Sequence, residues 1–84
     1  MSGLILPFPR SRDRGFIRRH AGLMASAPIA AKAEAHLLRQ LRIQRETLVR
    51  RGVDPERIEA ELTAIADNIR AAACSFMLAP GGAA

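Results

Sequence analysis

A four-residue segment, Gly52-Val53-Asp54-Pro55, constrains the fold of this chain more than any other feature. Glycine favours the left-handed conformation that ends many helices, and Val53 is placed to contact Leu48 in the closure known as a Schellman motif. Asp54 is a favourable N-cap, and Pro55 suits the first turn of a new helix. One helix is therefore predicted to end here and the next to begin at once, so that the second half of the chain folds back on the first.

Apolar residues on both sides of this turn recur at alternating spacings of four and three, which is typical of the seam between two helices that cross at a shallow angle. The seam positions before the turn are Ala30, Glu34, Leu37, Leu41, Gln44 and Leu48. Those after it are Ile58, Leu62, Ile65, Ile69, Ala72 and Phe76. The two sets match in register about Val53, from Leu48 with Ile58 to Ala30 with Phe76. The sequence thus predicts an all-α fold built on an antiparallel helical hairpin of residues 27–51 and 55–78. Ser26 is predicted to be the N-cap of the first helix of this hairpin.

Two members of the seam are polar. Glu34 falls near the open end of the hairpin, where water is expected to reach it. Gln44 falls near the centre, where a polar side chain can fix the register of paired helices. An unpaired buried amide would cost about 1–3 kcal/mol, so Gln44 is expected to find a hydrogen-bond partner.

A shorter helix is predicted over residues 12–25, with Ser11 or Asp13 as its cap. Its apolar face is formed by Phe16, Ile17, His20, Leu23 and Met24. One flank of the hairpin is small and apolar, with Arg45 facing Glu59 near the turn, and it forms a candidate interaction groove of Ala31, Leu38, Ala66 and Ala73. The opposite flank is polar and contains Gln40, Thr47, Glu61 and Asn68. The shorter helix is therefore expected to pack on the apolar flank; if it does not, the same groove is open to a second copy of the chain.

The chain divides into three parts. Residues 1–10 contain Leu4, Ile5, Leu6 and Phe8 between prolines and are predicted to form an extended N-terminal arm. Residues 11–78 form a single small helical domain, and residues 79–84 a disordered tail. The N-terminus has neither the basic start nor the long apolar run of a signal peptide or membrane span, so no membrane association is expected.

The residues that usually carry enzyme chemistry are sparse. The sequence has no Tyr, no Trp, one cysteine and two histidines. His20 is expected to pack on the apolar face of its helix, His36 to lie in solvent, and Cys74 to be a small packing residue. No metal-ligand spacing, phosphate-binding loop or nucleophile motif occurs. The chain is therefore expected to be non-enzymatic, with no metal, no cofactor and no small-molecule substrate.

The charge is unevenly distributed along the chain. Residues 1–53 contain eleven Lys or Arg and three Asp or Glu, whereas residues 54–84 contain two and five. Such an excess favours an acidic partner, although an Arg- and Ala-rich composition also arises in GC-rich genomes without selection for binding. The candidate nucleic-acid-binding residues are Arg10, Arg12, Arg14, Arg18, Arg19, Arg39 and Arg42. No aromatic residue stands beside them to stack on a base, so any binding is expected to be non-specific.

Two functional interpretations follow. The first is a small basic accessory protein that binds nucleic acid through its Arg-rich half. The second is an interaction module that forms a homodimer or binds an acidic protein through the apolar flank and the apolar N-terminus. A rival interpretation is that the basic residues form a solvated face.

The segments Phe8-Pro9-Arg10 and Arg14-Gly15-Phe16-Ile17-Arg18-Arg19-His20-Ala21 resemble those of a family of small, Arg-rich, uncharacterised alphaproteobacterial proteins. Members share an FP-x-x-R-x-x-G-F-I-R-R start, and Gln40-Leu41-Arg42-Ile43-Gln44 and the turn at Gly52 are similar too. The family is a domain of unknown function, so the resemblance implies no catalytic or binding residue. It implies a bacterial, cytoplasmic protein.

Overall fold

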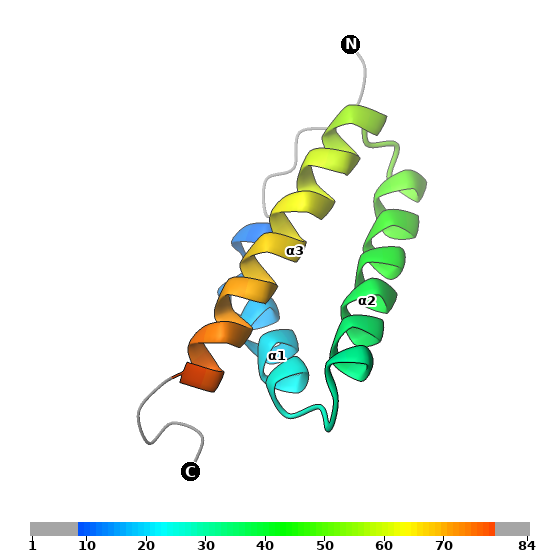
Figure 1. The fold of residues 1–84 in the computed structure, drawn as a ribbon. Helices are drawn as coiled ribbons and strands as arrows, with labels where there is room; N and C mark the ends of the chain where they lie inside the picture. Colours follow the sequence, from blue (N-terminus) through cyan, green and yellow to red (C-terminus); the bar gives the residue numbers. More distant parts are fainter. Residues whose placement is uncertain (1–8, 79–84) are drawn as a thin grey trace.

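The computed structural model describes residues 9–78, which form one short 3-10 helix and three α-helices (Figure 1). The 3-10 helix η1 spans Arg10–Arg12, and the α-helices are α1 (Arg14–Ala25), α2 (Ala30–Arg50) and α3 (Pro55–Leu78). The predicted all-α fold, a helical hairpin with a shorter N-terminal helix on one flank, is confirmed. The predicted arm falls outside the described residues except for Pro9 and Arg10, and Arg10 already belongs to η1; the predicted tail lies wholly outside them.

The turn between α2 and α3 has the predicted geometry. Gly52 has a φ of 78°, in the left-handed region. The backbone N–H of Gly52 donates to the Val49 carbonyl at 3.0 Å and that of Val53 to the Leu48 carbonyl at 3.1 Å, which together make a complete Schellman motif. The Val53 side chain is buried, and α3 begins at Pro55. The turn therefore reverses the chain through backbone hydrogen bonds and one glycine.

The boundary between α1 and α2 differs from the prediction. Ser26 ends α1 instead of starting α2, because its hydroxyl donates to the Gly22 carbonyl one turn back at 2.6 Å. Pro28 has no N–H and biases Ala27 away from helical backbone, so α2 starts only at Ala30, after an extended Ile29 without a side-chain cap. The predicted cap of α2 is therefore wrong, and α2 is about one turn shorter than expected.

Near the turn, α2 and α3 pair as predicted. Arg45 and Glu59 form an ion pair across the two helices, with Arg45 Nη2 3.0 Å from Glu59 Oε1. Glu34 lies closer to the open end and pairs with Arg70. Leu37, Ile65 and Ile69 are fully enclosed between the helices and form the centre of the core.

Toward the open end of the hairpin, the last turn of α1 enters between α2 and α3 (Figure 1). The predicted pair of Ala30 with Phe76 does not form, since both residues are exposed. Ala30 lies instead beside Ala73 and Met77 in a shared hollow. Toward the open end of the hairpin, the pairing of α2 with α3 alone thus gives way to a three-helix bundle.

The helix α1 packs on the polar flank of the hairpin, and the prediction of the apolar flank is wrong. Ser11 of η1 is held by α3: its N–H and hydroxyl each donate to the Glu61 carboxylate at 2.8 Å, and its carbonyl accepts from Asn68 at 2.8 Å. His20 of α1 contacts His36 of α2 at 2.9 Å. Glu61 is only 8% exposed as a result. The segment from η1 through α1 thus finds specific hydrogen-bond partners on the polar flank.

The expected groove on the apolar flank is divided. Ala66 and Ala73 are buried, whereas Ala31 and Leu38 are exposed, Leu38 by 54%. The ion pairs of Arg45 with Glu59 and of Arg70 with Glu34 bridge α2 and α3 over this side. Gln44, at the centre of the seam, is half-buried and lines an open hollow of about 490 Å³. Its side chain forms no hydrogen bond to any other residue in 9–78, so the protein partner expected for it is not present there.

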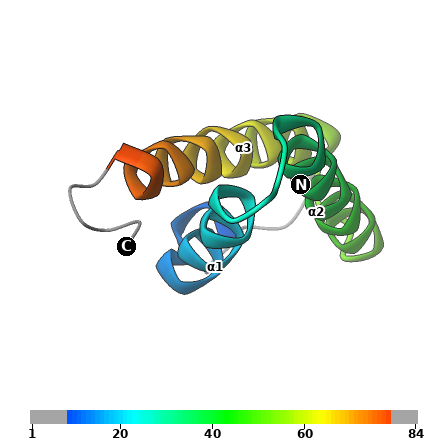
Figure 2. The same ribbon diagram turned by 60° about the horizontal axis from the view of Figure 1, so that its bottom comes forward.

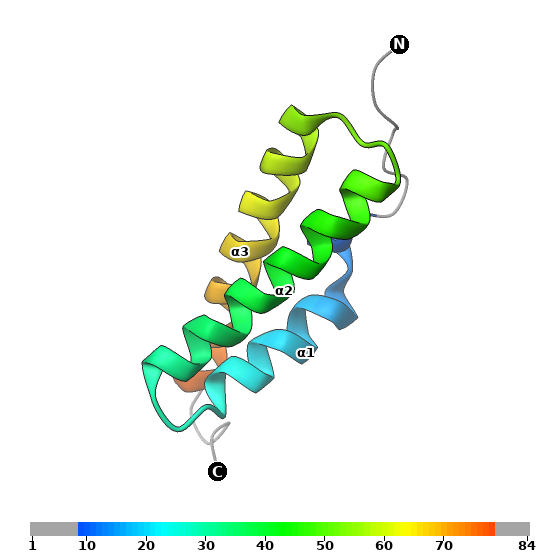
Figure 3. The ribbon, with the colours of Figure 1, turned by 90° about the vertical axis from the view of Figure 1, so that its right-hand side faces the viewer.

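The three helices form two layers. In Figure 2, α3 runs across the upper part of the view, and α1 and α2 both lie below it. From the α2 side, α1 and α2 run next to each other with α3 behind them (Figure 3). This arrangement matters for the charge, because α1 and α2 contain most of the arginines.

Candidate nucleic-acid interface

The start of α1 is shaped by Asp13. Its carboxylate accepts from the Phe16 N–H at 3.0 Å and so caps the helix, as one of the two predicted alternatives. The same carboxylate binds the Arg10 guanidinium at 2.7 Å. The Phe16 N–H and Arg10 together lower the pKa of Asp13. Because Arg10 is paired with Asp13, it is less available for a phosphate than the sequence suggested.

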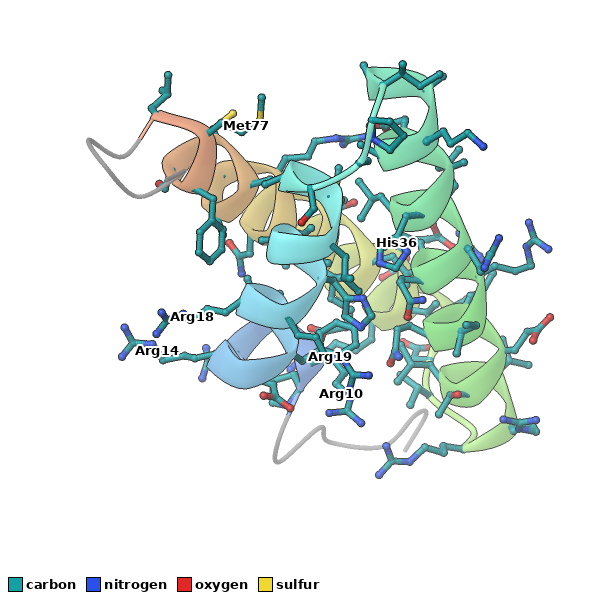
Figure 4. All side chains as sticks on the ribbon, turned by 90° about the horizontal axis from the view of Figure 1, so that it is seen from below. Arg10, Arg14, Arg18, Arg19, His36 and Met77 are labelled. Carbon is teal, nitrogen blue, oxygen red and sulfur yellow. The ribbon has the colours of Figure 1, made fainter. Side chains whose placement is uncertain are left out.

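Arg14 and Arg18 lie four residues apart on one side of α1 and point away from α2 (Figure 4). Both are exposed, and neither forms an ion pair with an acidic residue in the part of the chain that the structure describes. Arg12, in η1, is also exposed and unpaired there. These three side chains are therefore free to bind an anion.

Arg19 projects from a different side of α1, toward Arg10 (Figure 4). Arg39 and Arg42 lie on α2, two and five residues after the buried Leu37, and are exposed on the outer side of that helix. The seven predicted arginines therefore do not form one cluster. They divide between the outer side of α1, the α1–α2 junction and the outer side of α2.

A stack of side chains crosses the α1–α2 junction, and the sequence analysis did not anticipate it. The Arg10 guanidinium lies 5.1 Å from the centre of the Phe16 ring, Phe16 lies 4.6 Å from the His20 ring, and His20 meets His36. His36 is half-buried in this contact, so the expectation that it lies free in solvent is wrong. The two histidines are 16 residues apart on different helices, and no spacing in the sequence could have paired them.

The two histidines are arranged as a hydrogen-bonded pair. Nδ1 of His20 lies 2.9 Å from Nε2 of His36, and the ring centres are 5.1 Å apart, so the two nitrogens point directly at each other. Two ligands of one metal ion must instead both aim at a third point. Burial, His36 and the guanidinium groups of Arg19 and Arg10 lower the pKa of His20, which favours its neutral form. Within residues 9–78, no group of three or more His, Cys, Asp or Glu side chains could hold a metal ion.

The two layers of the bundle differ in charge. The segment from η1 through α1 has five arginines and one acidic residue, and α2 has five basic and two acidic residues. By contrast, α3 has two basic and four acidic residues. Because α1 and α2 lie on the same side of α3, the positive charge gathers in one layer (Figure 2). The part of the bundle formed by η1, α1 and α2 is thus more basic than α3, although its arginines point to different sides.

Cys74 is exposed and lines the hollow at the open end, so its predicted role as a packing residue is wrong. No helix within the described residues combines the length and the apolar character needed to cross a membrane.

The chain belongs to a family described as "Family of unknown function (DUF6074)", whose profile matches residues 1–84. Comparison with curated proteins and with solved structures finds no significant match.

Proposed function

We propose that this member of a family without an assigned activity binds nucleic acid non-specifically, through the layer formed by η1, α1 and α2. One observation carries the proposal: the cationic side chains of this layer are exposed and largely without acidic partners among residues 9–78. The unpaired set is Arg12, Arg14, Arg18, Arg19, Lys32, Arg39, Arg42 and Arg50. Arginine suits this role because its planar fork can donate two parallel hydrogen bonds to one phosphate.

The contacts available favour a duplex backbone over single-stranded bases. Phe16 already contacts the Arg10 guanidinium and the His20 ring, so its ring is not free for base stacking. Phe76 lies on α3, in the acidic layer. Backbone binding needs only cations spread over a face, and that is what the α1–α2 layer offers. Since the nucleic acid of a bacterial cell lies in the cytoplasm, the proposal also places the protein there.

The test is binding to random-sequence duplex DNA, measured by fluorescence anisotropy at several salt concentrations. We expect binding at low salt whose affinity falls steeply as salt rises, by a slope of about 0.9 for each phosphate neutralised. The triple variant Arg14→Gln, Arg18→Gln and Arg19→Gln should lose about tenfold or more in affinity at low salt and show a shallower slope.

A matched control removes the same charge elsewhere. Arg45, Arg57 and Arg70 belong to the α2–α3 side of the molecule, and Arg45 and Arg70 are already paired with Glu59 and Glu34. Replacing these three by Gln should weaken binding less than the α1 triple variant. Equal losses would show that only net charge matters, and no binding at low salt would refute the proposal.

The alternative from the sequence, an interaction module on the apolar flank, has less support. Of its four residues, Ala66 and Ala73 are buried, so no continuous apolar surface remains on that flank. The apolar N-terminal residues of that interpretation lie outside the described part of the chain.

A further inference from the structure

The histidine pair joins the two helices that hold most of the exposed arginines. Nδ1 of His20 in α1 lies 2.9 Å from Nε2 of His36 in α2, and both side chains are half-buried. Arg10 and Arg19 lie on the side of α1 that faces α2, close enough to His20 to affect its protonation (Figure 4). The pair therefore lies inside the proposed nucleic-acid interface, between its two helices.

Each ring has a second nitrogen that the pairing does not use, Nε2 of His20 and Nδ1 of His36. Neither of these outward nitrogens forms a hydrogen bond to another residue in 9–78. Within that range no buried side-chain nitrogen or oxygen lacks a partner, so both outward nitrogens reach the surface. A ligand can therefore approach the pair without displacing a hydrogen bond between these residues.

The protonation state of the pair decides what the outward nitrogens offer. A neutral imidazole has one N–H, so in the neutral pair one outward nitrogen is a donor and the other an acceptor. When the pair takes up one proton, the N–H···N bond between the rings stays and both outward nitrogens become donors. A second proton would place two N–H groups and two like charges against each other. The singly protonated pair thus keeps its internal bond and presents only donors, as an anion requires.

Positive charge next to His20 opposes its protonation in the free protein. Burial, His36 and the guanidinium groups of Arg19 and Arg10 lower the pKa of His20. Arg10 is paired with the Asp13 carboxylate, whereas Arg19 is exposed and forms no ion pair in residues 9–78. An anion bound beside Arg19 would offset this positive charge and so favour the proton.

The charged groups that α2 and α3 bring near the junction are cations or carboxylates that already have partners. On α2, Lys32 and Arg39 lie one turn before and one turn after His36, and both are exposed. Glu34 of the same helix is paired with an arginine of α3. On α3, Glu61 accepts two hydrogen bonds from η1. The junction is therefore a basic site that favours an anionic ligand.

We propose that one backbone phosphate of the bound nucleic acid lies at this junction, beside Arg19, and that the histidine pair takes up one proton from solvent when it binds. This inference rests on the proposed function, because it describes one contact within the same interface. The protonated pair holds the phosphate through N–H donors and a positive charge, while the bond between the rings keeps α1 and α2 together. Phosphate and proton favour each other's binding by the same factor, so the affinity for nucleic acid rises as the pH falls.

The first test is the affinity for random-sequence duplex DNA between about pH 7.2 and pH 5.5, measured by fluorescence anisotropy at constant salt. Carboxylates titrate mainly below this range and the α-amino group above it, so the two histidines account for most of the proton uptake. We expect the wild-type affinity to rise at least about threefold as the pH falls. The affinity of the double variant His20→Gln and His36→Gln should change less than about 1.5-fold over the same range.

A matched control places one histidine away from the junction. Leu38 is 54% exposed on α2, on the flank that α1 leaves uncovered, so Leu38→His in the double variant adds a titrating group there. This control should regain less than about half of the wild-type rise, because its added charge does not lie beside the phosphate. An equal rise would show that only net charge matters and would overturn the inference. A wild-type affinity that does not change with pH would overturn it too.

Proton NMR of the wild-type chain gives a second readout that needs no substitution. The histidine ring signals report the pH at which the pair takes up its first proton, measured in chloride, in sulfate at equal ionic strength and with duplex DNA. Sulfate resembles a phosphate group but does not itself titrate between the two pH limits. We expect duplex DNA to raise this midpoint by at least about 0.5, which corresponds to the threefold rise in affinity, and sulfate to raise it less.

The NMR result separates this inference from the proposed function. A midpoint that neither DNA nor sulfate raises would overturn the inference, even in a chain that binds DNA. A rise with sulfate as large as that with DNA would show that a free phosphate suffices, and would overturn the assignment to the nucleic-acid backbone. A rise with sulfate in a chain that binds no DNA would refute the proposed function and support the phosphate site alone.

Discussion

The two flanks of the α2–α3 hairpin differ in whether another helix covers them. The flank with Ala66 and Ala73 is closed by the contact of α2 with α3 themselves and is bridged at the surface by two ion pairs. The flank with Glu61 and Asn68 is covered by η1 and α1. The flank that looked more hydrophobic in the sequence is thus left uncovered, and the polar flank is covered.

The comparison shows that α1 covers the flank whose polar side chains find hydrogen-bond partners in η1, and not the flank with more apolar residues. Small alanines expose little area, and covering them would gain only about 25 cal/mol for each Å² removed from water. On the polar flank, Glu61 and Asn68 satisfy all three polar groups of Ser11, its N–H, hydroxyl and carbonyl. Each such hydrogen bond contributes about 0.5–1.5 kcal/mol net. The same docking also buries Ile17, Ala21 and Met24 of α1, so the covered flank gains both polar and apolar contacts.

The largest expected effect comes from filling the covered flank. Ala21 of α1 is fully enclosed, so Ala21→Leu should overpack the interface and lower the free energy of unfolding by roughly 3 kcal/mol. On the uncovered flank, Ala66 borders a hollow of about 230 Å³, so Ala66→Leu should cost less than about 1 kcal/mol. Urea unfolding followed by circular dichroism measures both, and equal losses would contradict the difference between the flanks.

A smaller effect is expected from removing the hydrogen bonds between Ser11 and Glu61. Glu61→Ala removes both hydrogen bonds to Ser11 and should lower the free energy of unfolding by about 2 kcal/mol, because the Ser11 N–H and hydroxyl then lose their partner. The matched control is Glu59→Ala, which removes an exposed ion pair on the other flank and should change stability little. A larger loss of stability in Glu59→Ala than in Glu61→Ala would show that the Ser11–Glu61 hydrogen bonds do not hold α1 on its flank.

The smallest expected effect depends on pH. The pKa of His20 is lowered from its usual 6.5 by burial, by His36 and by the nearby arginines. The unfolded chain therefore takes up this proton at a higher pH than the folded chain, and stability should be full above pH 6.5 and decline as the pH falls below it. Urea midpoints between about pH 8 and pH 5 measure the decline before most carboxylates titrate. His20→Gln should flatten the dependence, and an unchanged slope in that variant would exclude the histidine pair as its source.

Much of the hairpin could be predicted because its signals are local. Gly52 and Pro55 act through their own backbone preferences, and α3 begins and ends at the predicted residues. The pairing of Arg45 with Glu59 followed from helical spacing measured from the turn. Ser26 misled the prediction because a serine can cap the helix after it or bond back to the helix before it, and the residues around Pro28 decided between the two.

The candidate interface could be predicted only in part. The sequence named Arg14, Arg18, Arg39 and Arg42 as candidates, and all four are exposed, but it could not show that Asp13 would pair with Arg10. The stack from Arg10 to His36 is made by residues from η1, α1 and α2. This stack depends on which flank α1 covers, and no pattern among neighbouring residues in the sequence indicates that flank.

The sequence by itself determined that the chain is helical, where it reverses, and that its first half is the basic one, because backbone preference, apolar period and charge are properties of neighbouring residues. Only the tertiary structure decided which flank of the hairpin is covered and which arginines remain unpaired. Those outcomes depend on contacts between residues as distant as Ser11 and Asn68, whose free energy exists only after the helices have packed.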